Sequence, residues 1–133
     1  MTDSMKQHGA FSWNELMTTD VAAAKEFYRQ LLGWTLEDIQ NCDLGYSLAK
    51  IADQEVAGIM RIPPEAGDMP PAWGAYITVD DVEASARQVE SLGGKIILET
   101  RDIPDVGRFC VIADPQGAIV SLITYFDKAC EAS

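Results

Sequence analysis

Histidine is nearly absent from this chain. Among its 133 residues the one histidine is His8, which stands in a polar stretch near the start. A 2-His-1-carboxylate iron site needs two histidines, and so does a site of two histidines and one glutamate. The histidine count therefore excludes both kinds of metal centre. A magnesium or manganese site built only from carboxylates stays open, because these ions prefer oxygen ligands.

Basic residues are also scarce. The chain has 10 Lys and Arg against 21 Asp and Glu, a formal net charge of −11. Contacts to phosphates need clustered Lys and Arg, so this balance argues against binding to nucleic acid or to an anionic membrane surface. No apolar run approaches the length of a membrane-spanning helix, and residues 1–9 lack the apolar segment of a secretory signal. We therefore expect a cytoplasmic protein with no nucleic-acid or membrane partner.

The three cysteines, Cys42, Cys110 and Cys130, form neither a disulfide framework nor a zinc motif. Their number is odd and no two are spaced as C-x-x-C. Cys110 stands in an apolar run with Arg108 as its one basic neighbour, which is typical of an inert core thiol. P-loop and Rossmann glycine patterns are missing too. We expect no bound cofactor.

What the chain does contain is an internal repeat. The stretches Thr18–Trp34 and Val79–Gly94 each run from an apolar strand through an acidic helix start into an amphipathic helix that stops at glycine. A shift of 81 − 20 = 61 residues superposes them. The equivalent pairs are Asp20 and Asp81, Val21 and Val82, Ala23 and Ala84, Leu31 and Leu92, and Gly33 and Gly94. One repeat of about half the chain length indicates two similar halves.

Hydrophobic periodicity and turn residues predict the same element order in each half: strand, helix, three strands. The first half has strands at 10–17, 34–39, 46–51 and 55–62, with a turn at 41–45 and a helix capped by Thr19 or Asp20 and ended by Gly33. The second has strands at 72–79, 95–99, 108–113 and 118–125, with a loop at 100–107 and a helix that starts at Asp80 or Asp81. Four prolines make residues 63–71 a semi-rigid linker. We therefore divide the chain into a tail (1–9), modules 10–62 and 72–125, and a second tail (126–133).

This order and several motifs resemble the vicinal oxygen chelate superfamily, the group of glyoxalase I, the extradiol dioxygenases and the bleomycin- and fosfomycin-resistance proteins. The motifs are the run from Asp20-Val21 through Phe27-Tyr28 to Leu32-Gly33-Trp34, the helix start Asp80-Asp81-Val82 and the turn Asp114-Pro115-Gln116-Gly117. The resemblance implies an α+β fold of two βαβββ modules, whose curved mixed sheets surround a cavity. It also implies pairing of two chains into a homodimer.

The metal ligands of that superfamily can be carried over one position at a time. They fall on Trp13, Met60, Gly74 and Ser121, none of which is His, Glu or Asp. The stretch from Trp13 to Asp20 is similar to a glyoxalase-like branch that lacks the metal ligands. The resemblance therefore implies a cavity without metal, in which Trp13 fills volume and can stack on a flat ligand.

Glu15 is the polar residue of most interest. It stands two residues after Trp13, so both side chains face one side of the strand. If that side is the cavity, apolar surroundings raise the carboxyl pKa, which suits a general base or a ligand anchor. The alternative is a structural carboxylate that pairs with an arginine or caps a backbone group. Tyr76 takes the equivalent place in the second half, either to meet Glu15 or as a packed aromatic.

Other candidate ligand-binding residues have equally plain structural alternatives. Tyr46 and Trp73 could line the pocket or pack in the core. Met60 and Ser121 are candidates as well, because they stand at positions that hold metal ligands in the superfamily. Arg108 could clamp a ligand carboxylate, or form an ordinary salt bridge in so acidic a chain. Ser121 has no histidine to activate it as a nucleophile.

The sequence is compatible with three functions. The first is a protein that binds a small flat or apolar molecule in a cavity without metal. The second is a metal-independent isomerase or lyase with Glu15 as base and Tyr76 or Arg108 stabilising negative charge. The third, a lyase or dioxygenase dependent on a divalent metal, is disfavoured by the histidine count.

Overall fold

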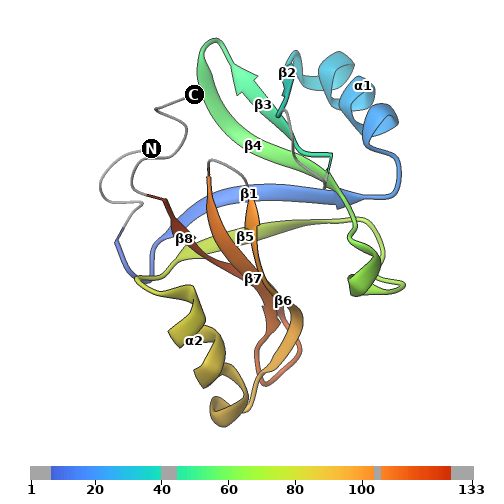
Figure 1. Cartoon of the computed structure of the whole chain (residues 1–133). Helices are drawn as coiled ribbons and strands as arrows, with labels where there is room; N and C mark the ends of the chain where they lie inside the picture. Colours follow the sequence, from blue (N-terminus) through green and yellow to red (C-terminus); the bar gives the residue numbers. More distant parts are fainter. Residues whose placement is uncertain (1–6, 40–44, 104–105, 127–133) are drawn as a thin grey trace. The chain divides into compact units, whose positions relative to one another are not determined.

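The computed structural model describes residues 7–39, 45–103 and 106–126 (Figure 1). The strands are β1 (Phe11–Thr18), β2 (Thr35–Asp38), β3 (Ser47–Ile51), β4 (Gln54–Arg61), β5 (Ala72–Thr78), β6 (Lys95–Ile103), β7 (Gly107–Ala113) and β8 (Ile119–Tyr125). The helices are α1 (Val21–Leu32), α2 (Val82–Val89) and the 3-10 helices η2 (Pro64–Ala66) and η3 (Glu90–Leu92). Strand, helix and three strands occur in this order twice, which confirms the predicted α+β fold of two βαβββ modules.

Local signals in the sequence place both helices. The Asp20 side chain accepts a hydrogen bond from the backbone N–H of Ala23 at 3.0 Å, which caps α1. Asp81 caps α2 in the same way, so Asp81 rather than Asp80 is the N-cap. After α1 the chain turns at Gly33 with φ 75°, a left-handed conformation that glycine adopts without strain.

The described residues form two compact units. The α1 unit, Trp13–Gly74, contains a sheet in the order β2-β3-β4-β1 (Figure 1). β1 runs parallel to β4, whereas β3 pairs antiparallel with both β2 and β4. The proline-rich stretch 63–71 lies in this unit and includes η2, whose proline at the first position is compatible with a helix start.

The α2 unit comprises Met1–Ser12 and Ala75–Ser133. Its sheet has the order β5-β8-β7-β6, with β5 parallel to β8 and the other pairs antiparallel. One face of this sheet packs against α2 through a buried cluster of Val79, Val82, Cys110 and Leu122. The division between the units falls inside β1 and inside β5, and the module boundaries predicted around residues 63–71 stay a prediction.

One strand is longer than predicted. We expected a strand at 95–99 and a loop at 100–107, but β6 continues to Ile103. Its register against β7 shifts twice, between Ile96 and Leu98 and between Leu98 and Arg101, so the alternation of apolar residues is broken. Asp102 lies opposite Arg108 on β7, and this pair of opposite charges stabilises the strand end.

Several predictions fall outside the described residues. They concern most of the turn at 41–45, the outer parts of both tails, Cys42 and Cys130. Among the residues that the structure describes, neither helix has the length and apolar character needed to span a membrane. The cytoplasmic location stays a prediction.

Candidate functional site

The two faces of β1 have different neighbours. Leu16 and Thr18 line a groove beside α1, so they face the helix. Trp13 and Glu15 point the other way, because successive side chains of a strand alternate between its faces. Glu15 is 1% exposed. A carboxylate is therefore buried on the sheet face opposite α1.

A tyrosine lies beside this carboxylate. In the parallel pairing of β1 with β4, Glu15 is opposite Gly58. A Cβ atom on Gly58 would stand 2.0 Å from the hydroxyl oxygen of Tyr46, so this phenol occupies the space that any other residue would fill. Neighbouring strands are roughly 5 Å apart, which puts the Tyr46 hydroxyl within about one strand spacing of Glu15.

Trp13 fixes the orientation of that phenol. Its indole Nε1–H donates a hydrogen bond to the Tyr46 hydroxyl oxygen at 2.8 Å, and Tyr46 is itself buried. The phenol oxygen is thus an acceptor towards Trp13. Three predicted residues, Trp13, Glu15 and Tyr46, come together on one face of the α1 unit.

Met60 extends this face by two residues along β4. It is fully buried and lies opposite Met17 of β1, on the side that carries Glu15. Gly58 lies opposite Glu15 and in contact with the Tyr46 ring, and it was not predicted as part of the site. The signal that could have found it is a glycine inside a strand, which often marks the close approach of another group.

In the α2 unit, Tyr76 and Ser121 are brought together. They are opposite each other in the parallel pairing of β5 with β8, and both are buried. The Tyr76 ring is tilted against Phe109, with ring centroids 5.7 Å apart. A meeting of Tyr76 with Glu15 would join the two units, and it stays a prediction.

The opposite face of the same sheet carries Cys110, under α2. Burial raises the pKa of the Cys110 thiol to about 11, and the nearby carboxylates of Glu99 and Glu83 add to the shift. At neutral pH this thiol is protonated, and the nucleophilic thiolate is nearly absent.

Arg108 is engaged in ion pairs within the α2 unit. Its Nε donates to Asp102 at 2.7 Å, and a terminal nitrogen donates to Glu83 at 3.1 Å. The hydrogen bond to Asp102 is the main cause of its raised pKa. This is the salt-bridge alternative considered above, and a role for Arg108 as a ligand clamp stays a prediction.

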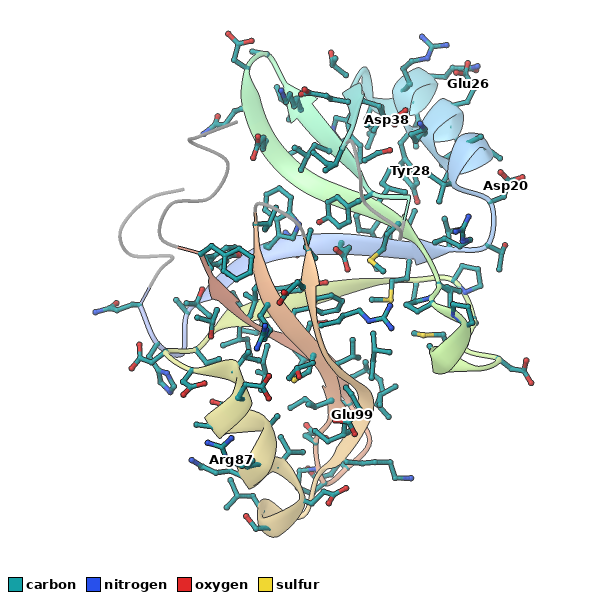
Figure 2. All side chains as sticks on the ribbon, viewed as in Figure 1. Asp20, Glu26, Tyr28, Asp38, Arg87 and Glu99 are labelled. Carbon is teal, nitrogen blue, oxygen red and sulfur yellow. The ribbon has the colours of Figure 1, made fainter. Side chains whose placement is uncertain are left out.

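Trp73 lies apart from Trp13, on the α1 side of the α1 unit. Its indole N–H donates to the Tyr28 hydroxyl at 3.0 Å, and its ring meets Tyr28 and Trp34 edge-on. Tyr28 and Trp34 stack on each other, with ring centroids 5.6 Å apart. Tyr28 reaches from α1 towards the strands of this unit (Figure 2). The structure therefore does not group Trp73 with Trp13 and Glu15, and sequence reasoning missed Tyr28 and Trp34.

The residues at the four positions where the superfamily has its metal ligands do not fit a divalent metal. Trp13 uses its nitrogen as a hydrogen-bond donor, Met60 offers a thioether, Gly74 has no side chain and Ser121 has a neutral hydroxyl. Divalent ions in proteins prefer carboxylates, imidazoles and thiolates. Within residues 7–39, 45–103 and 106–126, no three His, Cys, Asp or Glu side chains lie close enough to share an ion.

Comparisons with known proteins place the chain in a protein family. The model of the Glyoxalase/Bleomycin resistance protein/Dioxygenase superfamily matches residues 10–122. CFP32 of Mycobacterium tuberculosis, which carries the name of a glyoxylase, is 43% identical over 119 residues, or 87% of this chain and 46% of its own length. The anthracycline biosynthesis protein DnrV of Streptomyces peucetius is 33% identical over 123 residues, or 83% of this chain and 45% of its own. The chain thus spans about half the length of these curated relatives.

Solved structures share the fold. Methylmalonyl-CoA epimerase from Mycobacterium tuberculosis superposes with a TM-score of 0.59 at 19% sequence identity. The superposition covers 96% of this chain and 95% of that chain. At so low an identity the likeness concerns the fold alone.

Proposed function

This chain belongs to the Glyoxalase/Bleomycin resistance protein/Dioxygenase superfamily, and we propose that it binds a small, flat aromatic molecule without the help of a metal ion. The binding surface is the face of the α1 unit that carries Trp13, Glu15 and Tyr46. The observation that carries the proposal is a buried carboxylate beside a buried phenol whose orientation is set by an indole.

These groups are suited to a flat ligand with a polar edge. Burying a carboxylate is unfavourable unless polar partners compensate for the lost water. A carboxylate such as Glu15 accepts hydrogen bonds from a ligand hydroxyl or N–H group, and Tyr46 adds a phenol whose position is fixed by Trp13. The Trp13 ring offers a flat apolar surface for stacking. Together they favour a planar molecule with at least one hydroxyl group.

The name of one relative supports the choice of a first probe. DnrV is named for anthracycline biosynthesis, and anthracyclines are flat, hydroxylated polycyclic aromatics. We therefore choose 1,8-dihydroxyanthraquinone, a compact molecule with the same planar and hydroxylated character.

The test is a calorimetric titration of this probe, with tryptophan fluorescence quenching as a second measurement. We expect micromolar binding by the unaltered chain. Glu15→Gln keeps the size of the side chain but removes its charge, and we expect it to weaken binding at least about tenfold, since hydrogen bonds to charged groups contribute on the order of 1.5–3 kcal/mol. Glu55→Gln, the same change at an exposed residue of β4, is the matched control and is expected to bind as the unaltered chain does.

Two outcomes would contradict this proposal. If the unaltered chain does not bind the probe, the ligand class is wrong. If Glu15→Gln and Glu55→Gln bind equally well, Glu15 is not an anchor. Tyr46→Phe adds a second readout, because it removes only the hydroxyl that accepts from Trp13.

A metal-independent isomerase or lyase is the second candidate function. It is favoured by the same carboxylate and phenol on one face of the α1 unit, which can act as general base and proton donor. Glu15→Gln separates the two candidates. Retained ligand binding with lost turnover supports catalysis, whereas loss of binding supports Glu15 as an anchor.

A further inference from the structure

A second groove of the α1 unit lies where β1 and β4 end. These strands are parallel, and Thr18 is opposite Arg61, so their carboxyl ends meet at one edge of the sheet. The groove has a volume of about 410 Å³, which lies within the roughly 300–1,000 Å³ of small-molecule sites. Its lining includes Thr19, Arg61, Pro64, Asp68 and Met69.

Arg61 brings a positive charge to this groove. The basic residues Lys25, Arg29 and Arg108 are each paired with a carboxylate, as the acidic composition of the chain favours. Arg61 is exposed and forms no ion pair with any side chain that the structure describes. A planar guanidinium presents five N–H donors and matches a carboxylate with two parallel hydrogen bonds. Arg61 can therefore bind a carboxylate that a ligand supplies.

Asp68 brings the opposite charge to the same groove. Its side chain is exposed and does not pair with Arg61, although both residues line the groove. The two charged groups are therefore too far apart for direct contact. Because opposite charges attract, a ligand that carries both can lie between them, with its carboxylate at Arg61 and its ammonium group at Asp68.

The rest of the lining is mainly apolar. Pro64 and Met69 lie at the groove, and Pro63 is fully buried beside them. Proline has a fixed φ, so this part of the wall needs little ordering when a ligand binds. The unbranched side chain of methionine adapts to irregular shapes. The groove therefore suits a compact apolar group next to the two charges.

The overall charge of the chain narrows the choice of ligand. A net charge of −11 repels a simple anion, even one that could bind an arginine. A zwitterion has no net charge, so it avoids this repulsion and still presents a carboxylate. An α-amino acid with an aliphatic side chain combines a carboxylate, an ammonium group and an apolar group in one small molecule.

We propose that this groove binds a free α-amino acid with an aliphatic side chain. The carboxylate of the amino acid binds Arg61, its ammonium group binds Asp68, and its side chain packs against Met69. This proposal does not depend on the aromatic ligand. Arg61 directly follows Met60 in β4, so it points away from the face that carries Glu15.

Nuclear magnetic resonance of the isotope-labelled full chain, titrated with L-leucine, tests the proposal. We expect amide signals within residues 61–69 to shift, with a dissociation constant on the order of 1 mM, because charges that stay partly in solvent are screened. Two analogues remove one charge each. 4-Methylpentanoate is leucine without its ammonium group, and 3-methylbutylamine is leucine without its carboxylate. We expect each analogue to bind at least about tenfold more weakly, since it leaves one charge of the groove without a partner.

Two substitutions assign the two charges of leucine to the two residues. Arg61→Gln and Asp68→Asn each remove one charge from the groove, and we expect each to weaken leucine binding at least about tenfold. The matched controls are Arg87→Gln, at an exposed residue of α2, and Asp53→Asn, at an exposed residue of the turn between β3 and β4. Both controls should bind leucine as the unaltered chain does.

Three outcomes overturn the proposal. The first is the absence of any shift within residues 61–69 at about twenty times the expected dissociation constant. The second is an analogue that binds as tightly as leucine, because the groove then takes a simple anion or cation. The third is a loss in Arg61→Gln or Asp68→Asn that is no greater than in its control. Binding of the aromatic probe is measured separately, so either proposal can fail without the other.

Discussion

The two helices α1 and α2 occupy equivalent places in the repeat but are packed in different ways. Both start at an aspartate cap, and each is followed by a glycine in the left-handed conformation. Yet α2 buries Val82 and Val89 against the strands of its own unit, whereas α1 buries no residue. The difference therefore does not come from how the helices begin or end.

The residues that face the sheet explain the difference. Where α2 has Ala86 and Val89, the repeat shift of 61 places Lys25 and Tyr28 in α1. Lys25 reaches Asp38 on β2 with a hydrogen bond of 2.8 Å, and Tyr28 stacks on Trp34. Long side chains with polar tips lie between helix and strands, and they hold α1 by specific contacts instead of close packing.

The largest effect that separates the two helices is expected at the repeat-equivalent glycines Gly94 and Gly33. A Cβ atom on Gly94 would stand 2.7 Å from the carbonyl oxygen of Ala113, whereas nothing lies within 4 Å of a Cβ on Gly33. We expect Gly94→Ala to lower the free energy of unfolding by about 3 kcal/mol through overpacking. Gly33→Ala should lower it by about 1 kcal/mol, through the strain of its positive φ. Urea denaturation measures both.

The two glycine variants control for each other, since both add one methyl group at equivalent positions of the repeat, between a helix and the strand that follows it. Equal losses would show that α2 is not packed more closely than α1. A large loss for Gly33→Ala alone would reverse the comparison.

A smaller effect is expected at Val82 and its equivalent, Val21. Val82 belongs to the buried cluster beneath α2, and its truncation to alanine leaves a cavity there. We expect Val82→Ala to lower the free energy of unfolding by about 2 kcal/mol and Val21→Ala by less than about 1 kcal/mol, since Val21 is only half-buried. Measurement at low protein concentration keeps the two values comparable. A loss for Val21→Ala that matches or exceeds the loss for Val82→Ala would contradict the expected difference.

The parts of this fold that depend on local signals could be predicted from the sequence. The helix starts at Asp20 and Asp81 follow from capping chemistry, and the end of α1 at Gly33 follows from its backbone freedom. Period-two alternation predicted the strands, apart from β6. The prediction for β6 was wrong at the end of the strand. Residues 100–107 were predicted as a loop, whereas Asp102 pairs with Arg108 across the sheet.

The candidate site depends on contacts between distant residues, and less of it was predictable. Trp13 and Tyr46 were singled out separately, but their hydrogen bond joins residues 33 positions apart. Gly58 acquires its role only because the strand register brings it under Tyr46. Trp73 was expected to line the pocket or to pack in the core, yet Tyr28 and Trp34 hold it on the side of the α1 unit that carries α1. Such partners are set by register and packing, which a single sequence does not display.

The smallest effect concerns the contact that holds α1 to β2. Asp38 accepts hydrogen bonds from Lys25 at 2.8 Å and from Ser47 at 2.7 Å, and the bond from Lys25 is the main reason why its pKa is lowered. A carboxylate with a lowered pKa in the folded state adds stability at pH values above its unfolded pKa of about 3.9. That stability is lost as the pH falls through the folded pKa. The contact is largely exposed, so screening by solvent limits its contribution to about 0.5 kcal/mol.

A double-mutant cycle of Lys25→Met and Asp38→Asn isolates this contribution from other effects of either substitution. We expect a coupling free energy of about 0.5 kcal/mol at pH 7 that declines towards zero as the pH falls through the lowered pKa of Asp38. Amide exchange in α1 should accelerate in both single variants and be unchanged in α2, since α2 packs through a separate buried cluster. A coupling that is absent at pH 7 would mean that α1 is held by Tyr28 and Trp34 without the charged contact. The difference between the helices would then come from aromatic stacking without a charged contact.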